Sequence, residues 1–154
     1  MTEKRHLALG EGVNVAYPHP SSKSVSAVMR GNRSSDTSPE VALRAALHRR
    51  GYRFRKNLRI SVQGVARRPD IVFTRWKIVV FVDGCFWHSC PTHGRQPRSN
   101  SEYWSAKLGR NRARDAATND AFTSAGWAVV RVWEHEPTSM ALALVEEAIK
   151  AKAL

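Results

Sequence analysis

Four side chains that can bind a soft metal ion lie in two short stretches of the chain. Cys85, Cys90 and His93 fall within nine residues, a spacing over which one loop can wrap a tetrahedral Zn²⁺. His135 follows a run that resembles a strand, and a neighbouring strand end could bring it to that loop as a fourth ligand. The alternative is two buried structural thiols and two exposed imidazoles. The zinc interpretation would tie two strand ends together and make metal binding part of folding stability.

A second set of residues could bind Mg²⁺ and activate water. Asp70 begins an apolar strand directly after Pro69, and Asp83 and His88 flank the end of the next strand. Mg²⁺ prefers oxygen ligands and keeps several waters, so one or two carboxylates, a backbone carbonyl and a phosphate would suffice. Histidine titrates near neutral pH, which makes His88 the candidate general base or water-orienting group.

Three residues at or near this second set each have an alternative role on the sequence alone. Glu40 falls in the first turn of an expected helix, where it could support His88 or a metal-bound water from the opposite side. The alternative is that it is simply an acid favoured by the helix dipole. Asp70 could be an ordinary turn residue after Pro69. His88 could also be a zinc ligand, but we assign it to catalysis because Cys85, Cys90, His93 and His135 already make four.

The charge of the chain favours a polyanionic partner. Its 154 residues carry 25 Lys and Arg against 13 Asp and Glu, which gives a net charge of +12, and such an excess favours contacts with phosphates. The simpler alternative is a protein that tolerates surplus arginine. On the helix expected from Ser101, the basic residues that would neutralise phosphates are Lys107, Arg110, Arg112 and Arg114.

The length and composition fit one globular domain. No apolar run is long enough to span a membrane and no secretory signal is visible, so we expect a cytoplasmic protein that associates with the nucleoid when bound to DNA. In a reducing cytosol the two cysteines favour a metal site over a disulfide.

The elements that must position these residues are visible in the pattern of the sequence. We expect a flexible arm over residues 1–28 and a folded domain over residues 29–154, of the α/β class. The sheet should be mixed, because connections of hairpin length and of crossover length both occur. The expected elements are a helix from 37 to 51, strands over 52–55, 71–73 and 76–82, a loop over 84–100, a helix over 101–125, a strand over 127–133 and a helix over 138–154.

Several motifs in this order resemble the very-short-patch repair endonuclease family. The likeness runs from about Val25 to Ala151, and the G-C-F-W-H run is its most specific part. The motifs are Met29-Arg30-Gly31-Asn32-Arg33, Pro39-Glu40, Arg67-Arg68-Pro69-Asp70-Ile71-Val72-Phe73, Phe81-Val82-Asp83-Gly84-Cys85-Phe86-Trp87-His88, Tyr103-Trp104-x2-Lys107 and Gly126-Trp127-x5-Trp133-Glu134-His135.

This resemblance implies a restriction-endonuclease-like three-layer sandwich with a structural Zn²⁺. It also implies Mg²⁺-dependent hydrolysis of the phosphodiester 5′ to the thymine of a T:G mismatch. By position, Asp70 matches the family's metal-binding aspartate, the carbonyl of Val82 a second magnesium ligand, His88 the catalytic histidine and Glu40 its supporting acid. The four expected zinc ligands fall at or beside the family's zinc positions.

The resemblance also implies how a mismatch would be selected. Phe86 and Trp87, with Met29 from the other side, match residues that wedge into the base stack, and Arg30 lies in the same DNA-contacting motif as Met29. Wedging costs a few kcal/mol per step and is cheaper where pairing is already faulty. The alternative is that Phe86 and Trp87 are ordinary core residues.

The chain departs from the family where some relatives carry a histidine in place of Asp83, and some relatives space the zinc ligands differently. The expected partner is double-stranded DNA with a T:G mismatch, mismatch-repair proteins are candidate partners, and the chain is expected to be a monomer. Two rival functions remain: a restriction-type nuclease of the same fold without mismatch preference, and a zinc-stabilised DNA-binding module without activity.

Overall fold

The structure is a computed structural model that describes residues 35–154. The expected flexible arm, the start of the expected domain, and the expected DNA contacts Met29 and Arg30 lie outside these residues. No helix within the described range is long and apolar enough to cross a membrane.

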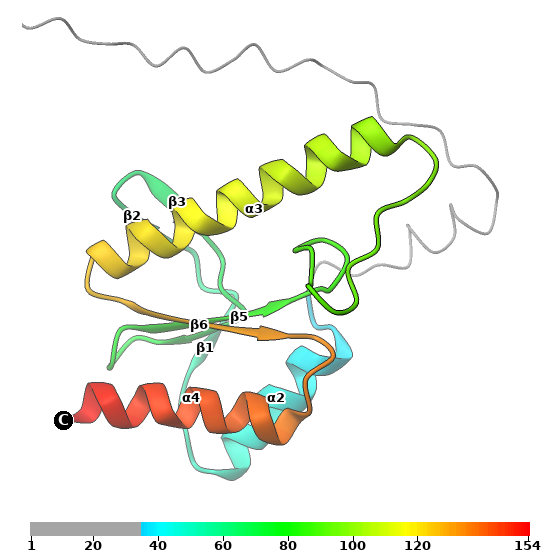
Figure 1. Ribbon diagram of the computed structural model, residues 1–154. Helices are drawn as coiled ribbons and strands as arrows, with labels where there is room; N and C mark the ends of the chain where they lie inside the picture. Colours follow the sequence, from blue (N-terminus) through cyan, green and yellow to red (C-terminus); the bar gives the residue numbers. More distant parts are fainter. Residues whose placement is uncertain (1–34) are drawn as a thin grey trace, which may run out of the picture.

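The described residues form an α/β fold whose order of elements largely follows the sequence-based expectation (Figure 1). The helices are α2 (Ser38–Arg49), α3 (Ser101–Ser124) and α4 (Thr138–Ala153). The strands are β1 (Arg55–Lys56), β2 (Ile60–Val62), β3 (Val65–Arg67), β4 (Ile71–Phe73), β5 (Ile78–Asp83) and β6 (Ala128–Trp133).

The central sheet is mixed, as expected. Its strand order is β1-β4-β5-β6, with β4 antiparallel to β5 and β5 parallel to β6. Two parallel strands need a long crossover, and α3 provides it. In this pairing Asp83 lies opposite Trp133, so the loop that follows β5 and the segment that follows β6 leave the sheet at the same edge.

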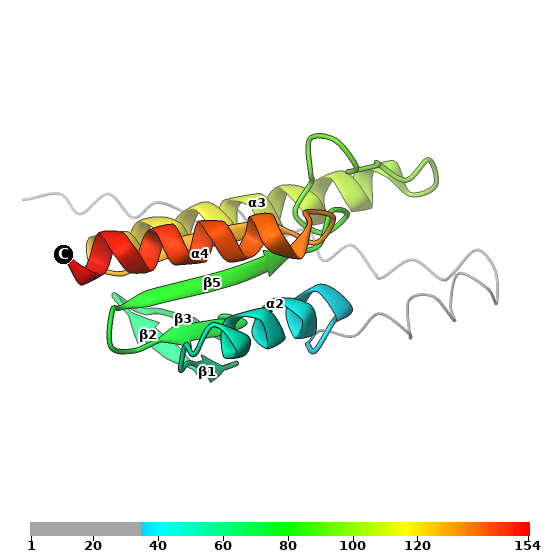
Figure 2. The same cartoon turned by 90° about the horizontal axis from the view of Figure 1, so that it is seen from below.

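Helices cover both faces of the sheet, which makes three layers (Figures 1 and 2). Successive strand residues point to opposite faces, and β5 follows this rule. Val80 packs with Leu47 of α2 and Val145 of α4. Val79 packs with Phe122 of α3. β5 is therefore buried on both sides, and its end is held in a fixed position.

Two details differ from the sequence-based expectation. The structure has five strands before α3 rather than three, because residues 60–67 form the hairpin β2-β3 on the α3 side. Its turn is Gln63-Gly64, with φ values of 48° and 77°, the backbone conformation that suits a tight hairpin. The edge strand also begins later than predicted, at Arg55.

The helix α2 begins where its sequence predicts, but its cap is different. Thr37 is the residue before the helix, and its hydroxyl makes no capping hydrogen bond. Instead Oε2 of Glu40 accepts the backbone N–H of Asp36, at 2.8 Å. An acid in the first turn thus fixes the entry of the chain into the helix.

Candidate active site and metal centre

The four residues predicted as zinc ligands lie together between the ends of β5 and β6. One ligand atom from each of Cys85, Cys90, His93 and His135 lies within 4.8 Å of all the others. Nδ1 of His135 is 3.0 Å from Sγ of Cys85 and 3.7 Å from Sγ of Cys90. Nδ1 of His93 is 3.9 Å from Sγ of Cys90.

This donor set fits a tetrahedral zinc ion. Zn–S bonds of about 2.3 Å and Zn–N bonds of about 2.1 Å place ligand atoms roughly 3.3 to 3.8 Å apart, close to the separations found. Both sulfurs are buried and both imidazoles are exposed. The group is therefore open to solvent on the histidine side.

Backbone contacts hold the two cysteines in position. The N–H of Cys85 donates to Oε1 of Glu134, at 2.8 Å, which links the loop to the end of β6. The N–H groups of Cys90 and Gly94 donate to the carbonyls of Cys85 and Cys90, at 2.9 and 2.8 Å. A Cβ at Gly94 would lie 2.5 Å from the carbonyl oxygen of Cys90, so the turn requires glycine here.

The two thiols differ in acidity. Burial and the neighbouring Cys90 raise the pKa of Cys85 to about 11. Burial also acts to raise the pKa of Cys90, but hydrogen bonds from the backbone of His93 and Thr92 outweigh it and lower that pKa to about 7. Cys90 is thus the cysteine that more readily supplies the thiolate that a metal needs.

Asp70 lies beside the end of β5, where the sequence predicted it. Its N–H donates to the carbonyl of Val80 at 3.0 Å, and its Oδ2 accepts the N–H of Val82 at 2.7 Å. Burial is the main cause that raises the pKa of Asp70 to about 6; the Val82 N–H lowers this pKa, and the carboxylates of Glu40 and Asp83 add to the increase. Repulsion among these acids is what a bound cation would relieve.

Asp70, Glu40 and Asp83 do not form a compact group of metal-ligand atoms. Among residues 35–154, only the cysteine and histidine group brings three or more such ligand atoms within 4.8 Å. A Mg²⁺ ion suits this arrangement, because it commonly uses one carboxylate and completes its shell with a carbonyl, waters and phosphate.

Glu40 of α2 is close enough to Asp70 for its carboxylate to raise the pKa of that residue. Its side chain is 3% exposed, and besides accepting the Asp36 N–H it lies 3.5 Å from Nη1 of Arg44. Within the described part of the chain Glu40 contacts Asp36 and Arg44, and not His88. Arg44 also pairs with Asp36 and lowers the pKa of Asp70.

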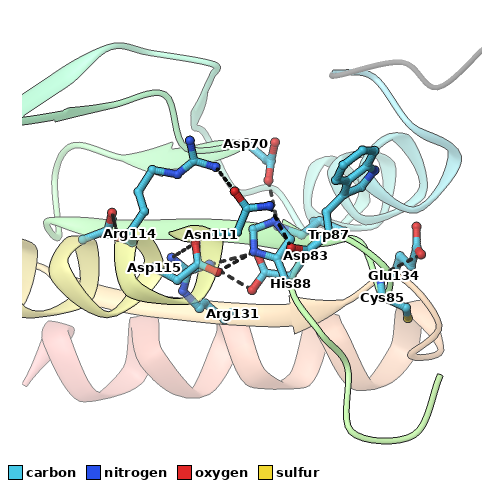
Figure 3. Close-up of polar contacts among 12 residues, drawn as sticks. Asp70, Asp83, Cys85, Trp87, His88, Asn111, Arg114, Asp115, Arg131 and Glu134 are labelled. Atoms are coloured by element: carbon cyan, nitrogen blue, oxygen red, sulfur yellow. Dashed lines mark hydrogen bonds and ion pairs between the residues drawn. The ribbon is translucent and has the colours of Figure 1, made fainter. Parts of the chain in front are cut away.

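His88 faces two carboxylates at the same edge of the sheet (Figure 3). Its Nδ1 lies 2.6 Å from Oδ2 of Asp115 and 3.7 Å from Oδ1 of Asp83. Its backbone N–H donates to the carbonyl of Gly84, at 3.1 Å, which fixes the turn that carries it. With Nδ1 directed at Asp115, Nε2 is the ring nitrogen that can act on a substrate.

Asp83 is engaged by an arginine. It is buried, and both of its oxygens accept hydrogen bonds from Nη1 of Arg131, at 2.8 and 2.9 Å. Burial raises the pKa of Asp83, and the charges of Arg131 and His88 offset part of the increase. Asp83 therefore takes part in the site through Arg131 and His88.

Asp115, Arg131 and Asn111 were not identified from the sequence. Asn111 donates from Nδ2 to the carbonyl of Trp87, at 3.1 Å. A signal did exist in the helix, because Leu108, Asn111 and Asp115 recur at the spacing of one helix face, and Leu108 is buried. An acid on the buried side of an arginine-rich helix indicates a polar partner in the interior.

The aromatic residues expected to contact DNA form one half-buried cluster. The ring centroids of Phe86 and Trp87 lie 5.0 Å apart, and both pack against Trp104, at 5.4 and 6.0 Å. Nζ of Lys107 lies 5.3 Å from the centroid of the Trp87 ring. Phe86 and Trp87 are thus partly packed and partly accessible.

The other basic residues predicted to contact phosphates are exposed on α3. Arg110, Arg112 and Arg114 all face solvent. Lys107 differs from them because it is half-buried and lies over aromatic rings. The helix therefore carries exposed arginines beside its polar site residues, and Nη2 of Arg114 donates to Oδ1 of Asn111, at 3.1 Å.

The chain is similar in sequence to known DNA endonucleases. A family model described as DNA mismatch endonuclease Vsr matches residues 19–93. The chain is 52% identical to the type II nicking enzyme V.NaeI of Lentzea aerocolonigenes, over 86% of this chain and 81% of that protein. It is 44% identical to the type II nicking enzyme V.XorIIP of Xanthomonas oryzae pv. oryzae, over 71% and 78%. It is 33% identical to the DNA mismatch endonuclease Vsr of Escherichia coli K12, over 69% and 66%.

Proposed function

This chain belongs to the Vsr family of DNA endonucleases, and on that premise we propose that it nicks one strand of a duplex 5′ to the thymine of a T:G mismatch, in a Mg²⁺-dependent reaction. We also propose that its three-layer fold is the restriction-endonuclease-like sandwich implied by the resemblance to very-short-patch repair endonucleases. The observation that supports the proposal is that Asp70 accepts the N–H of Val82 near the end of β5, and that the His88–Asp115 pair lies beside Asp83, the last residue of the same strand (Figure 3).

Each side chain has a defined task in this proposal. Mg²⁺, held by Asp70 and the carbonyl of Val82, would supply a Lewis acid for the scissile phosphate and its developing charge. Nε2 of His88 accepts a proton from the attacking water. Asp115 holds the imidazole by its Nδ1 and stabilises the positive charge that it gains.

The reaction is a hydrolysis with in-line attack. The water oxygen forms a bond to phosphorus, and the bond from phosphorus to the leaving sugar oxygen breaks. The proton taken by His88 returns to solvent, and the leaving oxygen gains a proton. Glu40 is buried and keeps the potential at Asp70 negative, which favours a divalent cation there.

Mismatch selection is assigned to Phe86 and Trp87. Their rings pack against Trp104 of α3, and both are partly accessible. Inserting such rings beside a base pair costs stacking energy, which is lower at a faulty pair. Met29 and Arg30 are proposed to contribute from the opposite side, and Arg110, Arg112 and Arg114 to neutralise flanking phosphates.

A second candidate function is nicking without a preference for mismatches. It is favoured by the relatives with 52% and 44% identity, which are named type II nicking enzymes. In that case the same residues would cut and the aromatic pair would be a packing feature.

One experiment separates these functions. Purified protein with Mg²⁺ is incubated with end-labelled duplexes that carry a T:G mismatch, a T:A pair or a pre-existing nick. We expect nicking of the T:G duplex alone, lost with Asp70→Ala and with EDTA. Equal nicking of the T:A duplex would support the second candidate. Binding without cutting in any divalent metal would contradict both and indicate a DNA-binding module.

A further inference from the structure

Arg131, on the edge strand β6, contacts several side chains of the site. It lies on β6, opposite Phe81 of β5, and its side chain is 20% exposed. Its Nη1 donates to both oxygens of Asp83, its Nη2 lies 3.5 Å from Oδ1 of Asp115, and its Nε donates to Oδ1 of Asn119, at 2.8 Å. One guanidinium thus joins three side chains.

The two carboxylates that Arg131 joins are the two that face His88. Asp115 lies on α3 and Asp83 ends β5, so they come from different layers of the fold. Both approach the same imidazole nitrogen, Nδ1, at 2.6 and 3.7 Å. Without a cation between them, two acids this close would repel each other and separate.

Arg131 is itself held rigidly. The face of its guanidinium lies 4.5 Å from the centroid of the Phe81 ring, and the Asn119 contact fixes its other end. A planar guanidinium with several donors and little freedom is suited to fixing the separation of two carboxylates, which the point charge of a lysine does less well. Arg131 therefore links the end of β5, through Asp83, to α3, through Asp115 and Asn119.

We propose that Arg131 is a positioning residue for cleavage, which orients His88 by holding Asp83 and Asp115 on the Nδ1 side of the ring. The inference rests on the proposed function, because it gives His88 the role of proton acceptor. Arg131 does not contact the reacting atoms in this proposal. Its effect falls on the rate of the chemical step and not on binding of DNA.

The test compares Arg131→Met and Arg131→Lys with the full-length wild-type chain on the T:G duplex. We expect Arg131→Met to lower kcat by roughly 10- to 100-fold, the loss that a small misplacement of a catalytic group produces, with KM within about threefold. Arg131→Lys should recover part of the loss, because it keeps the charge.

Two control variants separate positioning from stability and from charge. Arg50→Met removes one positive charge and the 3.8 Å ion pair of Arg50, the residue that follows α2, with Glu146 of α4. Val145→Ala creates a cavity in the core on the other face of the sheet. Both should keep kcat within about twofold at a temperature well below their melting points.

A second readout observes His88 directly. In ¹⁵N-histidine NMR spectra, with the His88 signals assigned by His88→Gln, the wild type should show a single tautomer with the proton on Nδ1. Arg131→Met should show a mixture of tautomers. An unchanged tautomer and an unchanged kcat in Arg131→Met would overturn the inference while the wild type still nicks DNA. A wild type that does not nick would instead overturn the proposed function.

Discussion

At the scale of single residues, Asp70 shows a conflict between binding a cation and stabilising the fold. Its carboxylate is largely buried, near Glu40 and Asp83, and its pKa is raised to about 6. The ordinary value for an aspartate in an unfolded chain is about 3.9. The ionised form needed to bind Mg²⁺ is therefore the form that the metal-free fold tolerates poorly.

The sign of the resulting pH dependence follows from the direction of the shift. Between about pH 4 and pH 6 the folded protein binds the proton of Asp70 and the unfolded chain has lost it, so stability falls as the pH rises through this window. We expect Asp70→Asn to stabilise the metal-free protein at pH 7.5 by about 1 to 3 kcal/mol and to abolish nicking. Urea unfolding at pH 4 and pH 7.5 measures the first effect.

Asp120→Asn is the matched control for this prediction, because Asp120 is an exposed aspartate on α3. It should change the free energy of unfolding by less than about 0.5 kcal/mol at either pH. If Asp70→Asn were destabilising at pH 7.5, the carboxylate would be a structural partner in the fold, and the case for a cation at Asp70 would be lost.

At the scale of elements, the group of two cysteines and two histidines proposed to bind zinc joins the loop after β5 to the segment after β6. Cys85 and Cys90 come from the first and His135 from the second. Removing Zn²⁺ should therefore loosen the two strand ends that carry the active site. We expect the purified protein to contain about one zinc per chain, and Cys90→Ser to lower the melting temperature by more than about 5 °C.

A chelator selective for zinc over magnesium distinguishes lost metal from altered packing. It should lower the melting temperature of the wild type and leave that of Cys90→Ser unchanged. A wild type that contains no bound metal after purification, and melts at the same temperature with and without the chelator, would rule out the structural zinc.

Periodicity and turn residues predicted most elements of this fold. The helices and the strands β4, β5 and β6 follow from apolar spacing together with Pro39 and Gly126, and Gly126 does have the left-handed φ of 85°. The hairpin β2-β3 was missed, although Gln63-Gly64 between alternating residues is a hairpin signal. Its strands have three residues each, which is too short for alternation to stand out.

The two halves of the site differ in how far the sequence could predict them. Cys85, Cys90, His93 and His135 were grouped because parallel strand ends meet at one edge, and the structure brings them together. Asp115 and Arg131 were missed because their contacts depend on the rotation of α3 over the sheet. That rotation is set by the packing of Phe122, which spacing along the chain does not reveal.

At the scale of the whole molecule, exposed positive charge and site residues meet on α3, where Arg114 donates to Asn111. The net charge of +12 includes Arg110, Arg112 and Arg114, which are exposed on α3. The same helix brings Asp115 to His88. A duplex held by these arginines would lie next to the end of β5, so the helix that attracts DNA also completes the site that would cut it.

The central claim is that this molecule hydrolyses one defined bond on one strand. The most direct test is to map the cut on a T:G duplex labelled in turn at the 5′ end of each strand, on a sequencing gel with Mg²⁺ present. If the proposed function is right, we expect one product, from the thymine strand, that ends at the bond 5′ to the mismatched thymine. Products from both strands, or the same product from the matched T:A duplex, would contradict it.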